Sequence, residues 1–201
     1  GGSAMQIRKA REEDYSRMLA VYERARQFMR DTGNPNQWKD TDPRPEAVLE
    51  GIRSGKAYVA VSEGKAVLEE EAVSDGMAAS DGKKEEGCGR DDSGEEILGA
   101  FYFAIEADAS YQEIFEGEWK NQEAYGVIHR VASSGSGKGF AAACFDWCRE
   151  QCLAFGCRNL RIDTHADNKV MQHVLEKNGF AYCGKIYLQD GAMRLAYQKC
   201  L

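Results

Sequence analysis

The sequence contains no apolar run that approaches the roughly 18 residues of a membrane-spanning helix. It also lacks the succession of basic, apolar and small residues that opens a secretory signal peptide. Basic residues interleaved with aromatic ones, the usual footprint of a nucleic-acid-binding surface, form no stripe in the chain. These absences predict a soluble, cytoplasmic protein whose partners include neither a membrane nor a nucleic acid.

Signals for disulfides and for a metal site are also missing, although the chain has seven cysteines. Their number is odd and no two of them form a CxxC pair, so we expect reduced thiols. Cys144, Cys148 and Cys152 recur at every fourth residue, which places them on one helical face as small buried hydrophobic groups. We therefore expect no metal.

One segment carries the acidic character of the chain, whose net charge is −7. Residues 63–96 hold twelve acidic and four basic side chains, and the remainder has a net charge of +1. The segment has almost no aromatic residues and no sustained apolar period, so residues 64–95 are interpreted as a disordered acidic insertion in a hairpin loop. An acidic arm that binds a partner is the alternative reading.

The rest of the chain has the length of one ordinary domain, residues 5–201. The first four residues, GGSA, precede Met5 and are interpreted as a cloning scar. Apolar periodicity predicts a mixed α/β (α+β) fold with about seven strands, mostly antiparallel, and about four helices. The expected strands are 5–10, 57–62, 97–106, 125–133, 159–165, 180–188 and 193–199, and the expected helices are 12–30, 45–52, 138–155 and 168–177.

A glycine-rich loop follows the fourth expected strand, where residues 133–143 read SSGSGKGFAAA. A dinucleotide-binding fingerprint would need a third glycine where Phe140 stands. A P-loop would need glycine at Ala132 and serine or threonine at Gly139. The arrangement that remains, a strand, a bare loop and a helix N-terminus, favours a diphosphate, while a plain glycine turn is the alternative.

Two motifs resemble those of the GNAT N-acetyltransferase superfamily. The loop is similar to that family's acyl-CoA loop, with Ser134 at the usual Arg or Gln and with Gly137 and Gly139 at the glycines. Asn168, followed after a helix by Asn178-Gly179-Phe180, is similar to the family's second motif. The resemblance spans Ile7 to about Lys199 apart from the insertion, and it implies the GNAT-like acyl-CoA N-acyltransferase fold.

The resemblance also implies an activity, namely direct transfer of the acetyl group of acetyl-CoA to a primary amine of a small molecule or peptide, by a monomer or homodimer. Acetyl-CoA would lie in the gap between strands 127–132 and 160–165. The implied cofactor-binding residues are Val131, Ala132, Ser133, Ser134, Gly135, Ser136, Gly137, Lys138, Gly139, Phe140 and Asn168. Leu175 stands where many members carry a proton-donating tyrosine, which keeps a second reading open: an acyl-CoA-binding module with little or no catalytic activity.

An attacking amine must lose a proton, so the site needs a base. Asp163 falls where some family members carry a catalytic glutamate, and the period of two places His165 on the same strand face. We expect these two residues to share one environment and prefer Asp163 as the base, with His165 and with His129 on the opposing strand as alternatives. Pairing of Asp163 with Arg161 or Arg130 would instead make it structural.

Two irregular segments are expected to bind the acceptor, because loops held over a rigid sheet carry most binding variation. Both contain aromatic residues that would form apolar walls of the site. The candidate substrate-binding residues are Trp38, Tyr111, Phe115, Trp119 and Tyr125.

Overall fold

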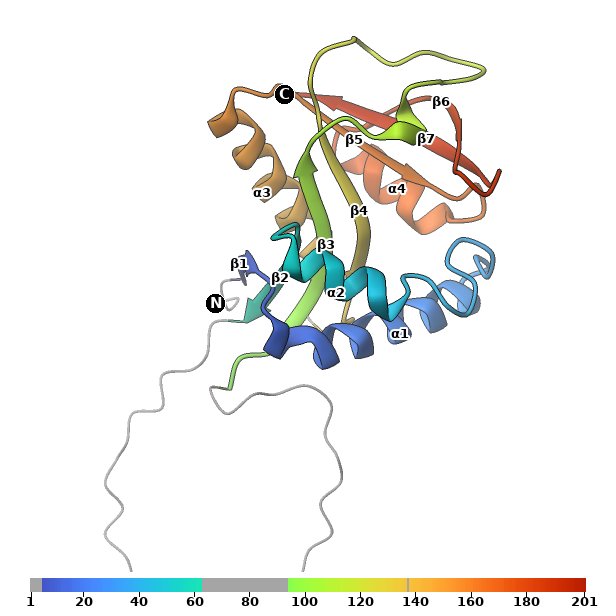
Figure 1. Ribbon diagram of the computed structural model, residues 1–201. Coiled ribbons are helices and arrows are strands. Elements are labelled where there is room, and N and C mark those ends of the chain that lie inside the picture. The colour runs from blue at the N-terminus through green and yellow to red at the C-terminus, as the bar shows by residue number, and fades with distance from the viewer. Residues whose placement is uncertain (1–4, 63–93, 137) are drawn as a thin grey trace, which may run out of the picture.

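The computed structural model describes residues 5–62, 94–136 and 138–201 (Figure 1). The predicted cloning scar, Gly137 of the glycine-rich loop and residues 63–93, which make up nearly all of the predicted acidic insertion, lie outside the described residues. Among the helices that are described, none is long and apolar enough to cross a membrane.

Seven strands form one mixed sheet in the order β1-β2-β3-β4-β5-β7-β6. All neighbours are antiparallel except β4 and β5, which run parallel. The strands are β1 (Met5–Lys9), β2 (Ala57–Ser62), β3 (Ile97–Ile105), β4 (Gly126–Ser133), β5 (Asn159–Thr164), β6 (Ala181–Tyr187) and β7 (Met193–Cys200). The α-helices are α1 (Tyr15–Asp31), α2 (Pro45–Arg53), α3 (Phe140–Phe155) and α4 (Lys169–Lys177). The predicted fold class is confirmed.

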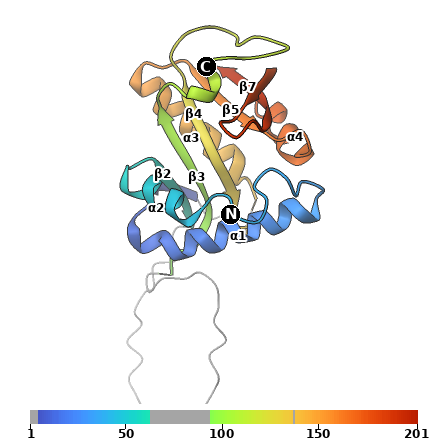
Figure 2. The same ribbon diagram turned by 45° about the vertical axis from the view of Figure 1, so that its right-hand side comes forward.

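Helices cover both faces of the sheet, as Figures 1 and 2 show. Side chains alternate along a strand, so Val59 and Val61 of β2 pack with α1 and α2 while Ala60 between them joins the core on the α3 side. That second core includes Cys144, Cys148 and Cys152, which are fully buried free thiols as their spacing predicts. Strands β2, β3 and β5 are thus buried on both sides over most of their length.

Strands β4 and β5 pair only where they begin. Their register joins Gly126 to Leu160 and Val127 to Arg161, and no further pair follows. Beyond this point β4 continues along β3 as far as Ser133, while β5 continues along β7 as far as Thr164. The two strands therefore diverge in the middle of the sheet. The cavities described below lie at this opening.

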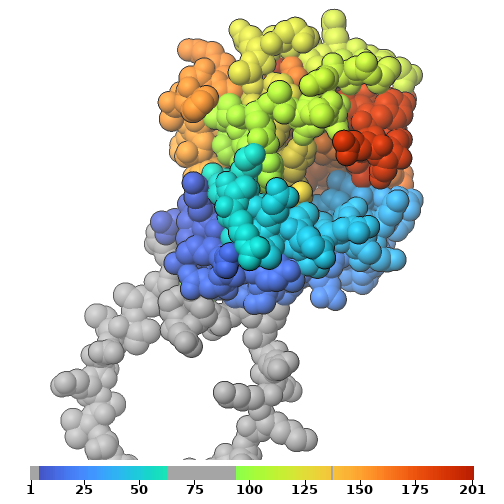
Figure 3. All heavy atoms as spheres, in the orientation of Figure 1, coloured from blue at the N-terminus to red at the C-terminus, as the bar shows by residue number. Residues whose placement is uncertain are grey.

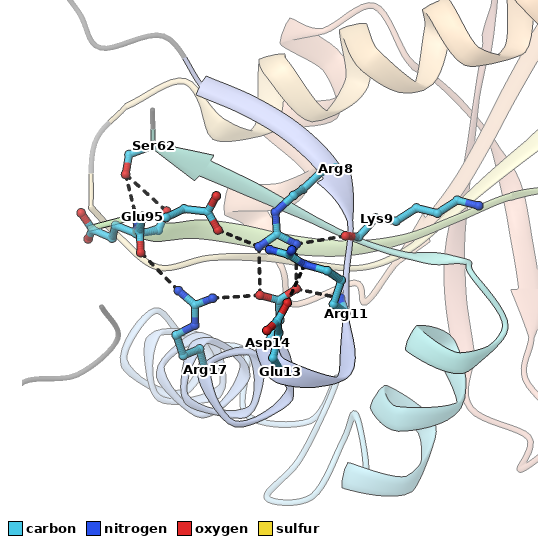
Figure 4. Close-up of polar contacts among 9 residues, drawn as sticks. Arg8, Lys9, Arg11, Glu13, Asp14, Arg17, Ser62 and Glu95 are labelled. Atoms are coloured by element: carbon cyan, nitrogen blue, oxygen red, sulfur yellow. Dashed lines mark hydrogen bonds and ion pairs between the residues drawn. The ribbon is translucent and has the colours of Figure 1, made fainter. Parts of the chain in front are cut away.

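A buried ion cluster links β1 and α1 to Glu95, which lies two residues before β3 (Figure 4). Asp14 has no exposed surface, and its carboxylate accepts hydrogen bonds from Arg8 at 2.7 and 2.9 Å and from Arg17 at 2.8 Å. Arg8 also pairs with Glu95 at 2.7 Å. Burial works to raise the pKa of Asp14, but the hydrogen bonds from Arg8 and from the Arg11 amide outweigh it and hold that pKa below its usual value.

The cluster predicts a specific loss of stability in the variant Asp14→Asn. Two half-buried guanidinium groups would lose the buried carboxylate that they share, so the free energy of unfolding at pH 7 should fall by roughly 3–5 kcal/mol. A lowered folded-state pKa stabilises the protein above the unfolded value of about 4 and loses that effect as pH falls through the folded value. The difference between variant and parent, measured by urea unfolding, should therefore shrink below about pH 4.

The matched control is Glu12→Gln, which removes the exposed ion pair between Glu12 and Arg53 at 2.9 Å. Exposed pairs contribute little, so this variant should unfold nearly as the parent does. Equal losses in the two variants would contradict a special role for the buried cluster.

Candidate active site

A β-bulge in β4 shapes the opening between the diverging strands. His129 pairs with Tyr102 and Ala132 pairs with Ala100, so Arg130 and Val131 together face one residue of β3. Arg130 has a φ of +55°, and its carbonyl accepts a 3.0 Å hydrogen bond from the hydroxyl of Tyr22 on α1. Such a bulge bends a strand and re-aims its side chains, which here brings the adjacent His129 and Arg130 to the same cavity.

That cavity has a volume of about 430 Å³ and lies where β4 and β5 diverge. Its walls come from the end of α1, the segment before α2, β4, β5 and the β7 residue Arg194. The lining residues are Met29, Gln37, Trp38, Asp42, Pro43, Arg44, Ala47, Asp108, Ser110, Ile128, His129, Arg130, Val131, Ile162, Asp163, Asn168, Met171, Leu188 and Arg194. Figure 3 shows the face on which the blue and cyan α1–α2 layer meets the green and red segments above it.

Asp163 lies on the β5 wall of this cavity and is held from two sides. Its Oδ2 accepts a 2.7 Å hydrogen bond from the hydroxyl of Tyr111, and its Oδ1 lies 4.0 Å from Nε of Arg194. Burial, followed by the charge of Asp163, raises the pKa of Tyr111 well above its usual value, so the phenol stays protonated and donates. The carboxylate is thus fixed in place.

His129 lies between two carboxylates. Its Nε2 is 2.8 Å from Oδ2 of Asp108, and its Nδ1 is 3.9 Å from Oδ2 of Asp163. Burial works to raise the pKa of Asp108, but hydrogen bonds from His129 and from the Ser110 amide lower it overall. An ionised carboxylate only accepts hydrogen bonds, so Nε2 carries a proton and, in the neutral ring, Nδ1 keeps its lone pair.

A second cavity of about 480 Å³ adjoins the first and shares with it Met29, Val131, Asn168 and Met171. One side is formed by the glycine-rich loop and the start of α3, through Ser133, Gly135, Gly139, Phe140 and Ala141. The other side is formed by α1 and α4, through Arg24, Ala25, Phe28, Thr32, Val170 and Val174, and Ala132 completes the lining. The two cavities meet beside the bulge.

The loop presents an uncapped helix N-terminus to this second cavity. Gly139 is the residue before α3, has a φ of +87°, and provides no side chain to cap the first amides of the helix. Gly135 has a φ of +81°, and the Arg24 guanidinium lies so close that a Cβ at Gly135 would clash with it. The hydroxyls of Ser133 and Ser134 accept from the amides of Gly135 and Ser136 and fix the loop. These groups fit an anion.

Sequence comparison assigns the chain to a family. The profile of the acetyltransferase (GNAT) family matches residues 30–180. The chain belongs to the GNAT acetyltransferase family. No curated protein sequence matches it.

Solved structures of GNAT proteins share the fold. A GNAT acetyltransferase from Streptococcus agalactiae is 28% identical, with a TM-score of 0.68, 98% of this chain and 95% of that chain covered. One from Listeria monocytogenes is 15% identical, with a TM-score of 0.65 and coverage of 100% and 97%. The Salmonella typhimurium protein yncA, solved with acetyl-CoA, is 13% identical, with a TM-score of 0.57 and coverage of 98% and 94%. This chain is a GNAT-type acetyltransferase.

Of the three predicted base candidates of this GNAT enzyme, two line the first cavity and the third does not. Asp163 and His129 line the first cavity, but β5 ends at Thr164 and His165 lines neither of the two cavities. His165 Nδ1 instead accepts from the amide of Asp167 at 3.0 Å, and burial, helped by the charge of Arg194, lowers its pKa. We predicted that His165 shares a strand face with Asp163. This prediction is wrong, because β5 ends one residue before His165.

Of the five predicted acceptor-binding aromatic residues, only Trp38 lines the first cavity. Tyr111 and Trp119 are buried against the sheet, where the ring of Trp119 and that of Tyr125 each lie 4.1 Å from the Arg161 guanidinium. Phe115 is 44% exposed and packs on Tyr187. Tyr111, Trp119 and Tyr125 thus hold the segment between β3 and β4 against the sheet, where aromatic rings bury a large apolar surface.

The predicted cofactor residues lie at or beside the second cavity. Val131, Ala132, Ser133, Gly135, Gly139, Phe140 and Asn168 line it, whereas Ser134, Ser136 and Lys138 do not, and Gly137 lies outside the described residues. Asn168 caps α4, accepting from the Met171 amide at 2.9 Å, and its Nδ2 donates to Gln37 at 2.8 Å.

Sequence reasoning missed Arg24, Asp108 and Arg194. Arg24 is one of many basic residues on α1, and Asp108 stands in an irregular segment. Their signals are weak: Asp108 precedes a turn that its side chain caps, and Arg194 is a charged residue within an otherwise buried strand pattern. The alternative that Asp163 pairs with Arg161 or Arg130 is wrong in its partners: among the described residues its arginine neighbour is Arg194, at 4.0 Å.

The buried contact between Tyr111 and Asp163 predicts the behaviour of Tyr111→Phe. The ring remains, but the carboxylate loses a hydroxyl donor in a largely buried site, so the free energy of unfolding should fall by about 1–3 kcal/mol. Calorimetry or urea titration measures the change. Tyr182→Phe is the control, because Tyr182 is 46% exposed, and it should be near neutral. A neutral Tyr111→Phe would show that Asp163 does not depend on this bond.

Proposed function

We propose that the chain transfers the acetyl group of acetyl-CoA to a primary amine of a small molecule or peptide. The observation that carries the proposal is the meeting of the two cavities beside the β4 bulge, with anion-binding groups in one and a histidine between two carboxylates in the other. Acetyl-CoA would occupy the cavity along the loop and α3, and the amine would occupy the cavity of His129.

The diphosphate of acetyl-CoA is proposed to lie at the N-terminus of α3. The first amides of this helix have no side-chain cap, and the helix dipole favours negative charge at that end. The family's usual loop Arg or Gln is Ser134 here, and Arg24 from α1 reaches the same loop at Gly135. Arg24 would therefore supply, from another element, the positive charge that the loop lacks, and the exposed Phe28 and Val170 provide apolar surface along the same cavity.

His129 is proposed as the base that accepts the proton of the attacking amine. The amine nitrogen forms a bond to the thioester carbonyl carbon, and the amine proton moves to Nδ1 of His129. The carbon–sulfur bond then breaks, and CoA leaves as a thiolate that takes up a proton from solvent. Asp108 holds Nε2–H and orients the ring, and both Asp108 and Asp163 would stabilise the imidazolium. Asp163 suits the base role less well, because its Oδ2 already accepts a hydrogen bond from the hydroxyl of Tyr111 and its Oδ1 lies 4.0 Å from Nε of Arg194.

The carbonyl oxygen becomes negatively charged during the attack and needs a donor. The backbone near Val131 is proposed to provide it, because the bulge interrupts regular pairing with β3 at this point and Val131 lines both cavities. Leu175 is fully buried, so the position of the usual family tyrosine contributes packing and no proton.

The first test concerns the proposed diphosphate site. Arg24→Ala should weaken acetyl-CoA binding by roughly tenfold, the effect of one charge-assisted hydrogen-bonding group, while leaving the melting temperature unchanged because the side chain is exposed. Isothermal calorimetry gives the dissociation constant. Arg30→Ala is the control, since Arg30 lies on the same helix and pairs with Asp40 at 3.3 Å. Equal affinity in the Arg24 variant and the parent would overturn the assignment.

The second test concerns the base. His129→Gln should lower kcat on an accepted amine by roughly 10²–10⁴ while acetyl-CoA binding persists. Asp108→Asn should lower kcat less, because the imidazole stays in the cavity but loses the carboxylate that holds Nε2–H. His173→Gln, at an exposed position of α4, is the control. If Asp163→Asn abolished turnover and His129→Gln did not, Asp163 would be the base.

A further inference from the structure

Two arginines line the proposed amine cavity without a carboxylate partner. Among the described residues, no carboxylate oxygen lies within ion-pair distance of Arg130 or Arg44. Within the described part of the chain, the side chain of Arg130 makes one hydrogen bond, a long one of 3.3 Å to the carbonyl of Ala47, and its guanidinium lies over the ring of Tyr102. A guanidinium has five N–H donors, so most of the binding capacity of this half-buried group is unused.

The two inner carboxylates of the same cavity, those of Asp108 and Asp163, already have hydrogen-bond partners in the protein. Asp108 is bound by His129 and the Ser110 amide, and Asp163 is bound by Tyr111 with Arg194 nearby. Asp42 is exposed at the rim beside Arg44. The inner wall therefore has uncompensated positive charge at Arg130 and no uncompensated negative charge.

The β4 bulge sets this charge next to the proposed base. In a regular strand His129 and Arg130 would face opposite sides, whereas here both line the amine cavity, and both also line an adjoining polar cavity of about 300 Å³. A single small molecule can thus present one group to His129 and another to Arg130.

We propose that the acceptor is a small amine that also bears a carboxylate, as a free amino acid does, and that Arg130 binds this carboxylate. The proposal rests on the proposed acetyl transfer and adds the class of acceptor. Arginine matches a carboxylate with two parallel hydrogen bonds, which would orient the amine toward His129 and the thioester. A volume of about 430 Å³ accommodates a molecule of amino-acid size.

The test compares sets of three amines that differ only in the anionic group. L-Alanine, L-phenylalanine and L-glutamine are each assayed beside the corresponding primary α-amide and the amine that lacks the α-carboxyl group, with thiol release as the readout. The parent enzyme should favour at least one amino acid over its two neutral counterparts by roughly 10–100-fold in kcat/KM, the effect of one charge-assisted pair.

Arg130→Gln keeps a side chain able to donate to Ala47 but removes the charge. It should bring the ratio between amino acid and amide close to one, because the amino acid loses a charge-assisted pair that the amide never makes, while the acetyl-CoA affinity stays within about threefold of the parent. Arg130→Lys should restore part of the preference, since the charge returns without the bidentate geometry. Arg53→Gln is the control, because Arg53 lies on α2 away from both cavities and pairs with Glu12.

The outcomes separate the two proposals. Amides or decarboxylated amines accepted as well as amino acids, or an unchanged preference in Arg130→Gln, would overturn the acceptor class and leave acetyl transfer standing. Turnover only with peptides whose carboxylate is distant from the amine would overturn it too. Acetyl-CoA binding without thiol release on any amine would remove the proposed function, and with it the basis of the acceptor class.

Discussion

The divergence of β4 from β5 is the constraint on which the site depends. Two parallel strands that paired along their full length would close the sheet, and the side chains of Ile128, His129, Ile162 and Asp163 would pack against neighbours. Pairing stops after Val127 and Arg161 because β4 follows β3 and β5 follows β7. The backbone groups freed by this separation and the cavities beside them provide the place where donor and acceptor can meet.

The bulge at Arg130 determines which polar side chains line this opening. It places a basic side chain and a histidine side by side on one cavity wall, and the hydroxyl of Tyr22 holds the bulged carbonyl from α1. A residue with φ of +55° that is not glycine is strained, so the contacts around it must keep it in place. Tyr22 and the α1–α2 layer thus support the reactive geometry from the side opposite to α3.

The carboxylates that line the site have hydrogen-bond partners, whereas two of its arginines have unused donors. Asp163 is held by a phenol and an arginine, and Asp108 is held by His129 and by the turn that follows it. The carboxylates are therefore preorganised and would need no rearrangement if His129 takes up the amine proton as proposed. Arg130 and Arg24, by contrast, have unused donors that face the two cavities, which is the state expected of groups that bind a ligand.

Sequence patterns alone determined the element order, the seven-strand mixed sheet, the helical face of the cysteines and the resemblance to the GNAT family, because each depends on local periodicity or on a short motif. The polar centre needed the tertiary structure. Asp108 reaches His129 across 21 positions and Tyr111 reaches Asp163 across 52, separations that no local pattern encodes. The bulge that turns Arg130 to the side of His129, the end of β5 before His165 and the approach of Arg24 to Gly135 likewise arise only when distant segments pack, since packing decides which way each side chain points.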